Sequence, residues 1–338
     1  MRKVRTEEAI GQALAHDVTA MREGFKGALF KRGHIIEKKD IPVLLDIGKK
    51  TVYVGEADEG LLHEEDCAIR LAGMVQVPEA HYTEPSEGKV LLIADVQGML
   101  RVDTGLLKEI NGIGDITIAT LPDHYKLEKG ASVASMRIVP LYTEEEQIEK
   151  AEELCRDRKL IRILPYINKK VGIIITGSEV YSGRISDRFE PVIRKKLDYY
   201  PAEIVDIKIC DDDKTMIVDA ARELLMNGAD FLIFTGGMSV DPDDLTPGAI
   251  KELGADIVSH GVPAQPGNMT LVAYLGDVPI LGVPGAAISL PTTMLDVMLP
   301  QIFAGERFTR KELIDLGDGG LCQKCNPCHF PNCTFGRY

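Results

Sequence analysis

Four cysteines near the C-terminus form the densest group of reactive side chains in the chain. Cys322, Cys325, Cys328 and Cys333 follow a C-x2-C-x2-C-x4-C spacing, and His329 lies inside the last spacer. Four thiolates this close together are typical ligands of a tetrahedral Zn²⁺ ion or of an iron–sulfur cluster. The spacing therefore predicts a metal site, slightly favouring iron–sulfur. The alternative is a disordered segment with free thiols, joined to the rest by a flexible GDGG stretch at 317–320.

Three glycine-rich turns form the second group of candidate residues. Each follows an expected strand, and their sequences are TGSE at 176–179, TGGMSVDPDD at 235–244 and GVPGAAIS at 282–289. Glycine lets backbone N–H groups approach a ligand closely, and Ser or Thr hydroxyls beside a helix N-terminus suit a phosphate or another oxyanion. The turns therefore predict a phosphate-bearing ligand.

Carboxylates gather at the same turns. They are Glu179, Asp211–Asp213, Asp241, Asp243 and Asp244. Acidic groups beside an anion site repel the ligand unless a divalent cation stands between them or they transfer protons. We therefore take Glu179 and Asp244 as candidates for Mg²⁺ binding or for catalysis. The alternative is that Asp213 only caps a helix and that residues 241–244 only form a solvated turn.

The elements that must position these groups lie between residues 169 and 309. Apolar runs predict strands at 171–176, 203–209, 230–235, 271–275 and 279–283. Helical patterns lie between them, from about 187, 213 and 246, and a long closing helix is expected from 287 to 303. This alternation predicts a mostly parallel sheet with helices on both faces, an α/β/α three-layer fold. In such sheets ligands bind beyond the carboxyl ends of the strands, where the three turns lie.

The order of these motifs resembles a known family. The segments TGSEV, SGRISD, DDD, TGGMSVDPDD, QPGN and LGVPGAAIS follow one another as in the molybdopterin-binding domain of molybdenum cofactor biosynthesis. The resemblance is closest to the molybdopterin molybdenumtransferases, the family of the gephyrin E domain, and covers about residues 169–305. It extends more weakly to the N-terminus, through GQALAHDVTA and the ALFKRGHIIEKKDI stretch. It implies binding of molybdopterin, usually adenylylated, and insertion of molybdate with Mg²⁺ and cleavage of the nucleotide.

The resemblance also implies roles for single residues. Pterin and phosphate would be held by Thr176, Gly177, Ser178, Gly236, Gly237 and Ser239. Glu179 and Asp244 would serve Mg²⁺ or the reaction, and Pro284, Gly285 and Ser289 would form the loop near the molybdate. The family further implies a homodimer.

Two other functions stay open. Ser178 stands where the family has an acid, and no segment matches the family's SAMDGYA-like N-terminal loop. These differences favour a non-catalytic carrier that hands finished cofactor to a molybdoenzyme, with the cysteine tail as a docking or redox element. A nucleotide hydrolase like the competence-damage-inducible proteins is the third possibility, and the N-terminal similarity to the transferases argues against it.

Composition sets the remaining expectations. With 39 Lys and Arg against 52 Asp and Glu, the net charge is −13, which disfavours a nucleic-acid partner. No apolar run approaches a membrane span, and the N-terminus lacks the apolar region of a signal peptide, so we expect a cytoplasmic protein. The expected divisions are a mixed segment at 1–60, a small α+β scaffold domain at 61–142, a connector helix and linker at 143–168, the molybdopterin-binding α/β domain at 169–309 and a Cys-rich tail at 310–338.

Overall fold

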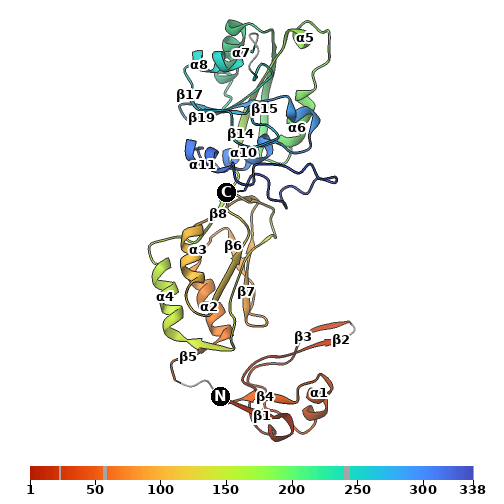
Figure 1. The fold of residues 1–338 in the computed structure, drawn as a ribbon, viewed down its shortest axis with the longest axis vertical. Coiled ribbons are helices and arrows are strands. Elements are labelled where there is room, and N and C mark those ends of the chain that lie inside the picture. Colours follow the sequence, from red (N-terminus) through yellow and green to blue (C-terminus); the bar gives the residue numbers. More distant parts are fainter. Residues whose placement is uncertain (23, 56–58, 240–243, 338) are drawn as a thin grey trace. The chain divides into compact units, whose positions relative to one another are not determined.

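A computed structural model describes residues 1–22, 24–55, 59–239 and 244–337. Its contacts divide the chain into two units (Figure 1). The first comprises residues 1–95, 102–121 and 129–162, and the second comprises 96–101, 122–128 and 163–338. The candidate site residues all belong to the second unit.

The N-terminal part of the first unit is a small mixed structure. Its elements are β1 (Arg2–Arg5), a 3-10 turn (Thr6–Glu8), β2 (Val18–Arg22), β3 (Phe25–Phe30), α1 (Asp40–Asp46) and β4 (Thr51–Val54). Strand β1 pairs antiparallel with β4, and β2 pairs with β3. Leu14, Ile36, Leu44 and Val54 are buried together and form its core.

The remainder of the first unit is an antiparallel sheet with helices. Its elements are β5 (Leu61–His63), α2 (Glu64–Met74), β6 (Ala80–Tyr82), β7 (Lys89–Ala94), α3 (Thr104–Asn111), β9 (Ile116–Thr120), β11 (Ser132–Ile138), β12 (Tyr142–Glu144) and α4 (Glu145–Cys155). The strand order is β6-β7-β11-β9, and β5 pairs with β12. Arg70 of α2 donates hydrogen bonds of 2.7 Å to Glu145 and Glu152, so α4 is fastened to this unit.

A six-stranded sheet organises the second unit. Its strands are β14 (Lys169–Thr176), β15 (Ala202–Cys210), β16 (Phe231–Thr235), β17 (Asp256–His260), β18 (Leu271–Leu275) and β19 (Val278–Val283). They follow the order β15-β14-β16-β19-β18-β17; the first four run parallel, β18 is antiparallel to β19, and β17 is antiparallel to β18 and so runs in the same direction as the first four. The predicted mostly parallel sheet is confirmed.

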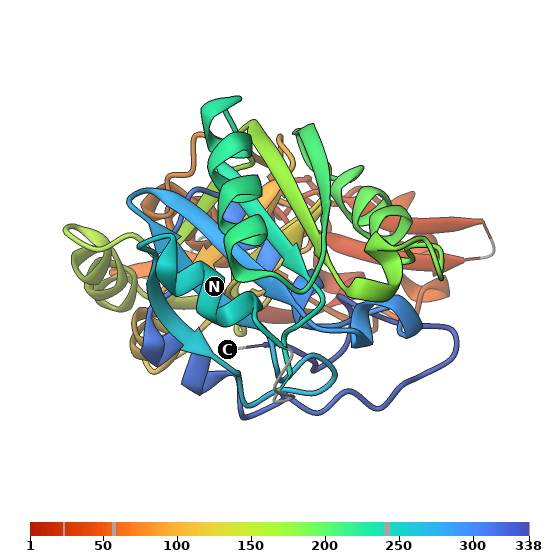
Figure 2. The ribbon, with the colours of Figure 1, turned by 90° about the horizontal axis from the view of Figure 1, so that it is seen from above.

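Helices cover both faces of this sheet. They are α5 (Ser178–Tyr181), α6 (Phe189–Leu197), α7 (Lys214–Met226), α8 (Thr246–Glu252), α9 (Ala286–Ser289), α10 (Met294–Phe303) and α11 (Arg310–Asp315). Successive side chains of β14 enter opposite cores: Ile173 and Ile175 pack with α6 and α10, whereas Ile174 packs with α7 and α8. Strands buried on both faces require the continuous apolar runs in the sequence. The three-layer α/β/α fold is therefore confirmed (Figure 2).

The prediction of one continuous closing helix from 287 to 303 is wrong. It is interrupted between α9 and α10, where Leu290 has extended backbone angles of φ −123° and ψ 139°. Pro291 causes this break, because a proline disfavours helical angles in the residue before it and lacks an N–H donor. Thr293 and Asp296 then start α10 with a reciprocal capping box.

Earlier and later segments complete the second unit. It takes in most of β8 (Gly98–Val102), all of β10 (Lys126–Leu127), which pairs antiparallel with β8, and most of β13 (Ile161–Pro165). The segment that follows α11 is hydrogen-bonded to Gln265. The Gln265 N–H donates to the Gly320 carbonyl at 2.7 Å, and the Cys322 N–H donates to the Gln265 carbonyl at 2.8 Å. The stretch expected as a flexible joint is thus fastened to the preceding domain. Among the described residues, no helix has the length and apolar character needed to cross a bilayer.

Candidate functional site

The candidate site is a cavity of about 700 Å³ at the carboxyl ends of β14 and β16. Strand β14 has β15 on one side and β16 on its other side. The order in which the strands are added to the sheet therefore reverses at β14. Crevices at such reversals are the usual ligand sites of open parallel sheets. Its lining includes seven predicted residues: Thr176, Gly177, Ser178, Glu179, Gly236, Gly237 and Asp244. The predicted phosphate turns after β14 and β16 therefore share one cavity.

Two threonines hold the turns together below the cavity. The buried Thr176 hydroxyl donates to the carbonyl of Thr235 at 3.2 Å, and the Thr246 hydroxyl donates to the carbonyl of Gly236 at 3.0 Å. The two hydroxyls lie 3.1 Å apart. Thr246 begins α8, so it fixes the turn after β16 against the end of β14. Sequence reasoning missed Thr246, although its place at a helix start after the TGG turn was visible.

Both glycines of the second turn are sterically required. Gly236 has φ +81°, and a Cβ there would lie 2.2 Å from the carbonyl oxygen of Thr176. Gly237 has φ +55°, and a Cβ there would lie 2.7 Å from Thr246 Oγ1. The left-handed conformation and the close approach both exclude a larger residue. Bare backbone therefore faces the cavity at this turn.

The acidic segment after β15 forms hydrogen bonds with the turn after β14. The backbone N–H of Ser178 donates to Asp212 Oδ2 at 2.8 Å, and Ser178 Oγ lies 2.5 Å from Asp211 Oδ1. That hydrogen bond is the main cause that lowers the pKa of the Asp211 carboxyl. Asp213 accepts the Met216 N–H at 2.7 Å, which confirms it as the cap of α7. The Asp212 carboxylate thus accepts the backbone N–H of Ser178, a residue that the resemblance assigned to the ligand.

The lining of the cavity is rich in carboxylates. Glu179, Asp187, Asp212 and Asp244 line it, against one guanidinium, that of Arg188. Asp187 is structural, because its carboxylate accepts the N–H groups of Phe189 and Glu190 and so starts α6. Asp241 and Asp243 lie outside the described residues. Carboxylate oxygens are the donors that Mg²⁺ prefers, so these residues are of the right chemical type, although within the described part of the chain no three of them are placed to hold one ion.

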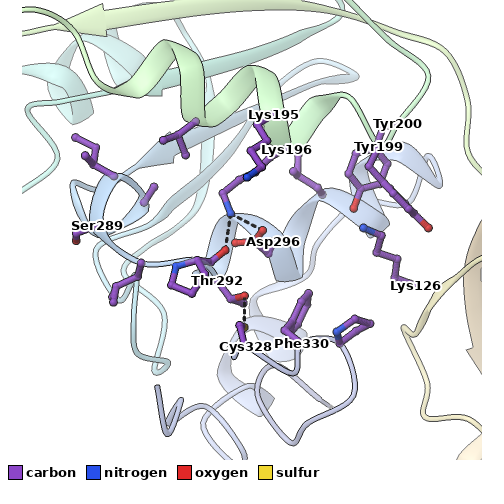
Figure 3. Close-up of a pocket in the computed structure, with 17 residues that line it drawn as sticks. Lys126, Lys195, Lys196, Tyr199, Tyr200, Ser289, Thr292, Asp296, Cys328 and Phe330 are labelled. Atoms are coloured by element: carbon purple, nitrogen blue, oxygen red, sulfur yellow. Dashed lines mark hydrogen bonds and ion pairs between the residues drawn. The ribbon is translucent and has the colours of Figure 1, made fainter. Parts of the chain in front are cut away.

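The other predicted residues lie elsewhere. Ser239, Pro284 and Gly285 are not part of this lining, whereas Ser289 lines a neighbouring cavity of about 570 Å³. Ile288 lines both cavities, so they adjoin at this residue. Figure 3 shows the neighbouring cavity, which sequence reasoning missed because its residues come from distant segments.

The tail cysteines are close in space but not gathered into one shell. Cys322, Cys325 and Cys328 line a third cavity of about 420 Å³, whereas Cys333 packs beside the apolar core. The N–H of Lys324 donates to Cys322 Sγ at 3.3 Å, and Cys328 Sγ lies 3.1 Å from Thr292 Oγ1. Within the described part of the chain, no three His, Cys, Asp or Glu side chains are placed to hold one metal ion. The four-thiolate site stays a prediction.

Comparison with known proteins finds relatives of the domain that contains the site. Residues 172–304 match the family described as a probable molybdopterin binding domain. Residues 3–56 match a separate family, a domain of unknown function. This match does not link the N-terminus to the transferases, so the similarity expected there stays a prediction.

Individual relatives match parts of the chain. A molybdopterin molybdenumtransferase of Bacillus subtilis is 34% identical over 134 residues, which are 36% of this chain and 30% of the transferase. A CinA-like protein of a Mycobacterium species is 38% identical over 80 residues, 24% of this chain and 19% of that protein. The chain thus spans less than a third of the length of each of these two relatives.

Solved structures are similar to about two fifths of the chain. The molybdopterin biosynthesis enzyme MoaB of Thermus thermophilus has a TM-score of 0.33 at 21% identity, over 42% of this chain and 99% of its own. The tungsten cofactor synthesizing protein MoaB of Pyrococcus furiosus has a TM-score of 0.35 at 25% identity, over 40% and 93%.

Proposed function

We propose, from the premise that residues 172–304 form a molybdopterin-binding domain of the molybdenum cofactor biosynthesis family, that the chain binds adenylylated molybdopterin and inserts molybdate with Mg²⁺. The observation that carries the proposal is the single cavity made by the ends of β14 and β16. There, Gly236 and Gly237 expose backbone beside Glu179 and Asp244.

Each group would have a distinct part in this reaction. The glycine turn would approach the phosphates, because no side chain keeps a ligand away from the backbone there. Glu179 and Asp244 would hold Mg²⁺, which neutralises phosphate charge when a nucleotide is cleaved. Without that cation, the lining carboxylates would repel the ligand. The loop of Pro284, Gly285 and Ser289 would approach the molybdate end.

The test is release of AMP from adenylylated molybdopterin in the presence of molybdate and Mg²⁺. Release that depends on both additions, and that disappears with EDTA, is the expected result. Pterin binding without AMP release under any condition would instead identify a carrier. Ser178, bonded to Asp211 and Asp212 where the family has an acid, is the observation that favours this second function.

We also propose that the tail binds a metal through Cys322, Cys325, Cys328 and Cys333. The support is their spacing and the cavity that three of them share. Thiolate–metal bonds are strong enough to draw a short segment into one shell. Anaerobic preparation should yield about one zinc, or about four iron with acid-labile sulfide, per chain. A Cys155→Ser control should keep the metal, whereas Cys325→Ser should lose it. Less than about a tenth of an equivalent of any transition metal would exclude the site.

The remaining proposals concern the localisation, assembly and partners of the protein. We propose a cytoplasmic homodimer that supplies a molybdoenzyme. Light scattering at micromolar concentration tests the assembly, and a monomer would contradict it. Unchanged elution of DNA or RNA in the presence of the chain is expected from its net charge of −13.

A further inference from the structure

We infer that the cavity adjoining the candidate site binds a second ligand, an aromatic anion about the size of a mononucleotide, through Lys126 and Lys195. The cavity lies between α6, the link from α9 to α10, and the tail. This inference does not rest on the proposed function, because none of its cationic residues lines the glycine-turn cavity.

Two lysines give this cavity a positive charge that the protein leaves unbalanced. Lys196 is committed: its ammonium donates to Asp296 Oδ1 at 2.6 Å and to the Pro291 carbonyl at 3.1 Å (Figure 3). Within the described part of the chain, neither Lys126 nor Lys195 forms an ion pair. In a chain with a net charge of −13, unpaired cations that line one hollow point to an anionic ligand.

Lys126 carries the stronger part of this argument. Its ammonium lies 3.0 Å from the ring centroid of Tyr199 and 5.5 Å from that of Tyr200. The rings satisfy the cation only in part, and burial is the main cause that lowers the pKa of Lys126. Glu128 and Asp296 raise this pKa, but within the described part of the chain neither forms an ion pair with the Lys126 ammonium, so a ligand of opposite charge would stabilise it.

The size and walls of the cavity specify an organic ligand. A volume of about 570 Å³ lies within the range of small-molecule sites and is far larger than a single oxyanion needs. Its apolar wall includes Val192, Leu299 and Phe330, and Ser289 and Thr292 add hydroxyls. A flat ring with one phosphate or carboxylate matches this combination of aromatic surface, hydroxyls and cations.

The tail forms one wall of the same cavity. Cys328, Phe330 and Pro331 line it, opposite the lysines of α6 (Figure 3). Of the tail cysteines, Cys328 therefore lines the cavity of the second ligand, and none lines the cavity of the glycine turns.

The experiment is calorimetric titration of the full chain with three probes: AMP, adenosine and inorganic phosphate. AMP carries both a ring and a phosphate, so it should bind at least about 10-fold more tightly than either part alone. Lys126→Glu and Lys195→Glu should each weaken AMP binding by about 10-fold or more. The matched control is Arg194→Glu, the same charge change on the neighbouring position of α6, where Arg194 pairs with Glu190 away from the cavity. It should change affinity less than about 2-fold.

A further variant separates this site from the glycine turns. Gly237→Asp blocks the candidate site, so AMP that still binds to this variant must occupy another cavity, and adding Lys126→Glu to Gly237→Asp should weaken that remaining binding by about 10-fold. AMP that fails to bind at millimolar concentration would overturn the inference. So would AMP binding that Gly237→Asp abolishes and both lysine variants preserve. Lys195 is exposed, so Lys195→Glu tests the cavity even where Lys126→Glu lowers the melting temperature.

Discussion

The two adjoining cavities are built in opposite ways. The candidate site takes its shape from backbone at the ends of β14 and β16, with bare glycines and carboxylates around it. The neighbouring cavity takes its character from side chains, with lysines, tyrosines and Phe330 brought from three separate segments. A site made of strand ends tolerates few substitutions at its glycines, whereas a site made of side chains can change its ligand by single replacements.

The largest effect should come from breaking the backbone site. Gly237→Asp puts a Cβ 2.7 Å from Thr246 Oγ1 and adds a carboxylate where phosphate is expected to meet backbone. We expect pterin affinity to fall by about 100-fold or more, from strain and charge repulsion together. Gly228→Asp is the control, because Gly228 has φ +92° with open space around it. Equal pterin affinity in both variants, measured by equilibrium dialysis below their melting temperatures, would place the ligand elsewhere.

Removing the acids should separate catalysis from binding at the same site. Glu179→Ala and Asp244→Ala should each reduce AMP release by about 100-fold, because a missing Mg²⁺ ligand or proton carrier acts on the transition state. Pterin affinity should change much less. The matched control is Glu190→Ala, a half-buried acid of α6 that pairs with Arg194. Unchanged AMP release in both variants would leave Glu179 and Asp244 as solvated turn residues.

The hydroxyl that joins the two turns should contribute to stability. Thr246→Val removes the hydrogen bond to the Gly236 carbonyl and leaves that carbonyl without this partner at a buried position. We expect the free energy of unfolding to fall by about 1–3 kcal/mol, measured by urea denaturation. Thr246→Ser keeps the hydroxyl and should lose less than half as much. Equal losses in the two variants would show that the methyl group, not the hydrogen bond, matters.

The smallest expected effect is a pH dependence of AMP affinity at the side-chain cavity. Burial holds the pKa of Lys126 below its usual range, so its ammonium is lost at a lower pH than that of a surface lysine. AMP affinity should therefore fall by a few-fold as the pH rises through that lowered pKa, and it should be restored when the pH returns. Lys126→Gln should flatten this part of the profile while leaving the contribution of Lys195. A fall of the same size in Lys126→Gln would assign the pH dependence to another group.

The same contrast explains what the sequence could predict. The apolar runs of β14 and β16 and the TGSE and TGG turns predict the sheet, its faces and the cavity lining, since local order alone places them at one edge. The break before α10 was missed, because the helical pattern from 287 to 303 outweighed the single Pro291. The lysine cavity could not be predicted, since Lys126, Lys195 and Phe330 meet only through tertiary packing.

Asp296 also bears on the order in which the second unit folds. One of its oxygens accepts the N–H of Thr293, three residues away, and the other accepts the ammonium of Lys196, a hundred residues away. Closing the short contact costs little chain entropy, whereas the long one must wait until a large loop has closed. We therefore expect α10 to present an oriented carboxylate before α6 arrives. Lys196 then docks on a partner that is already in place, which makes this ion pair a late step of assembly.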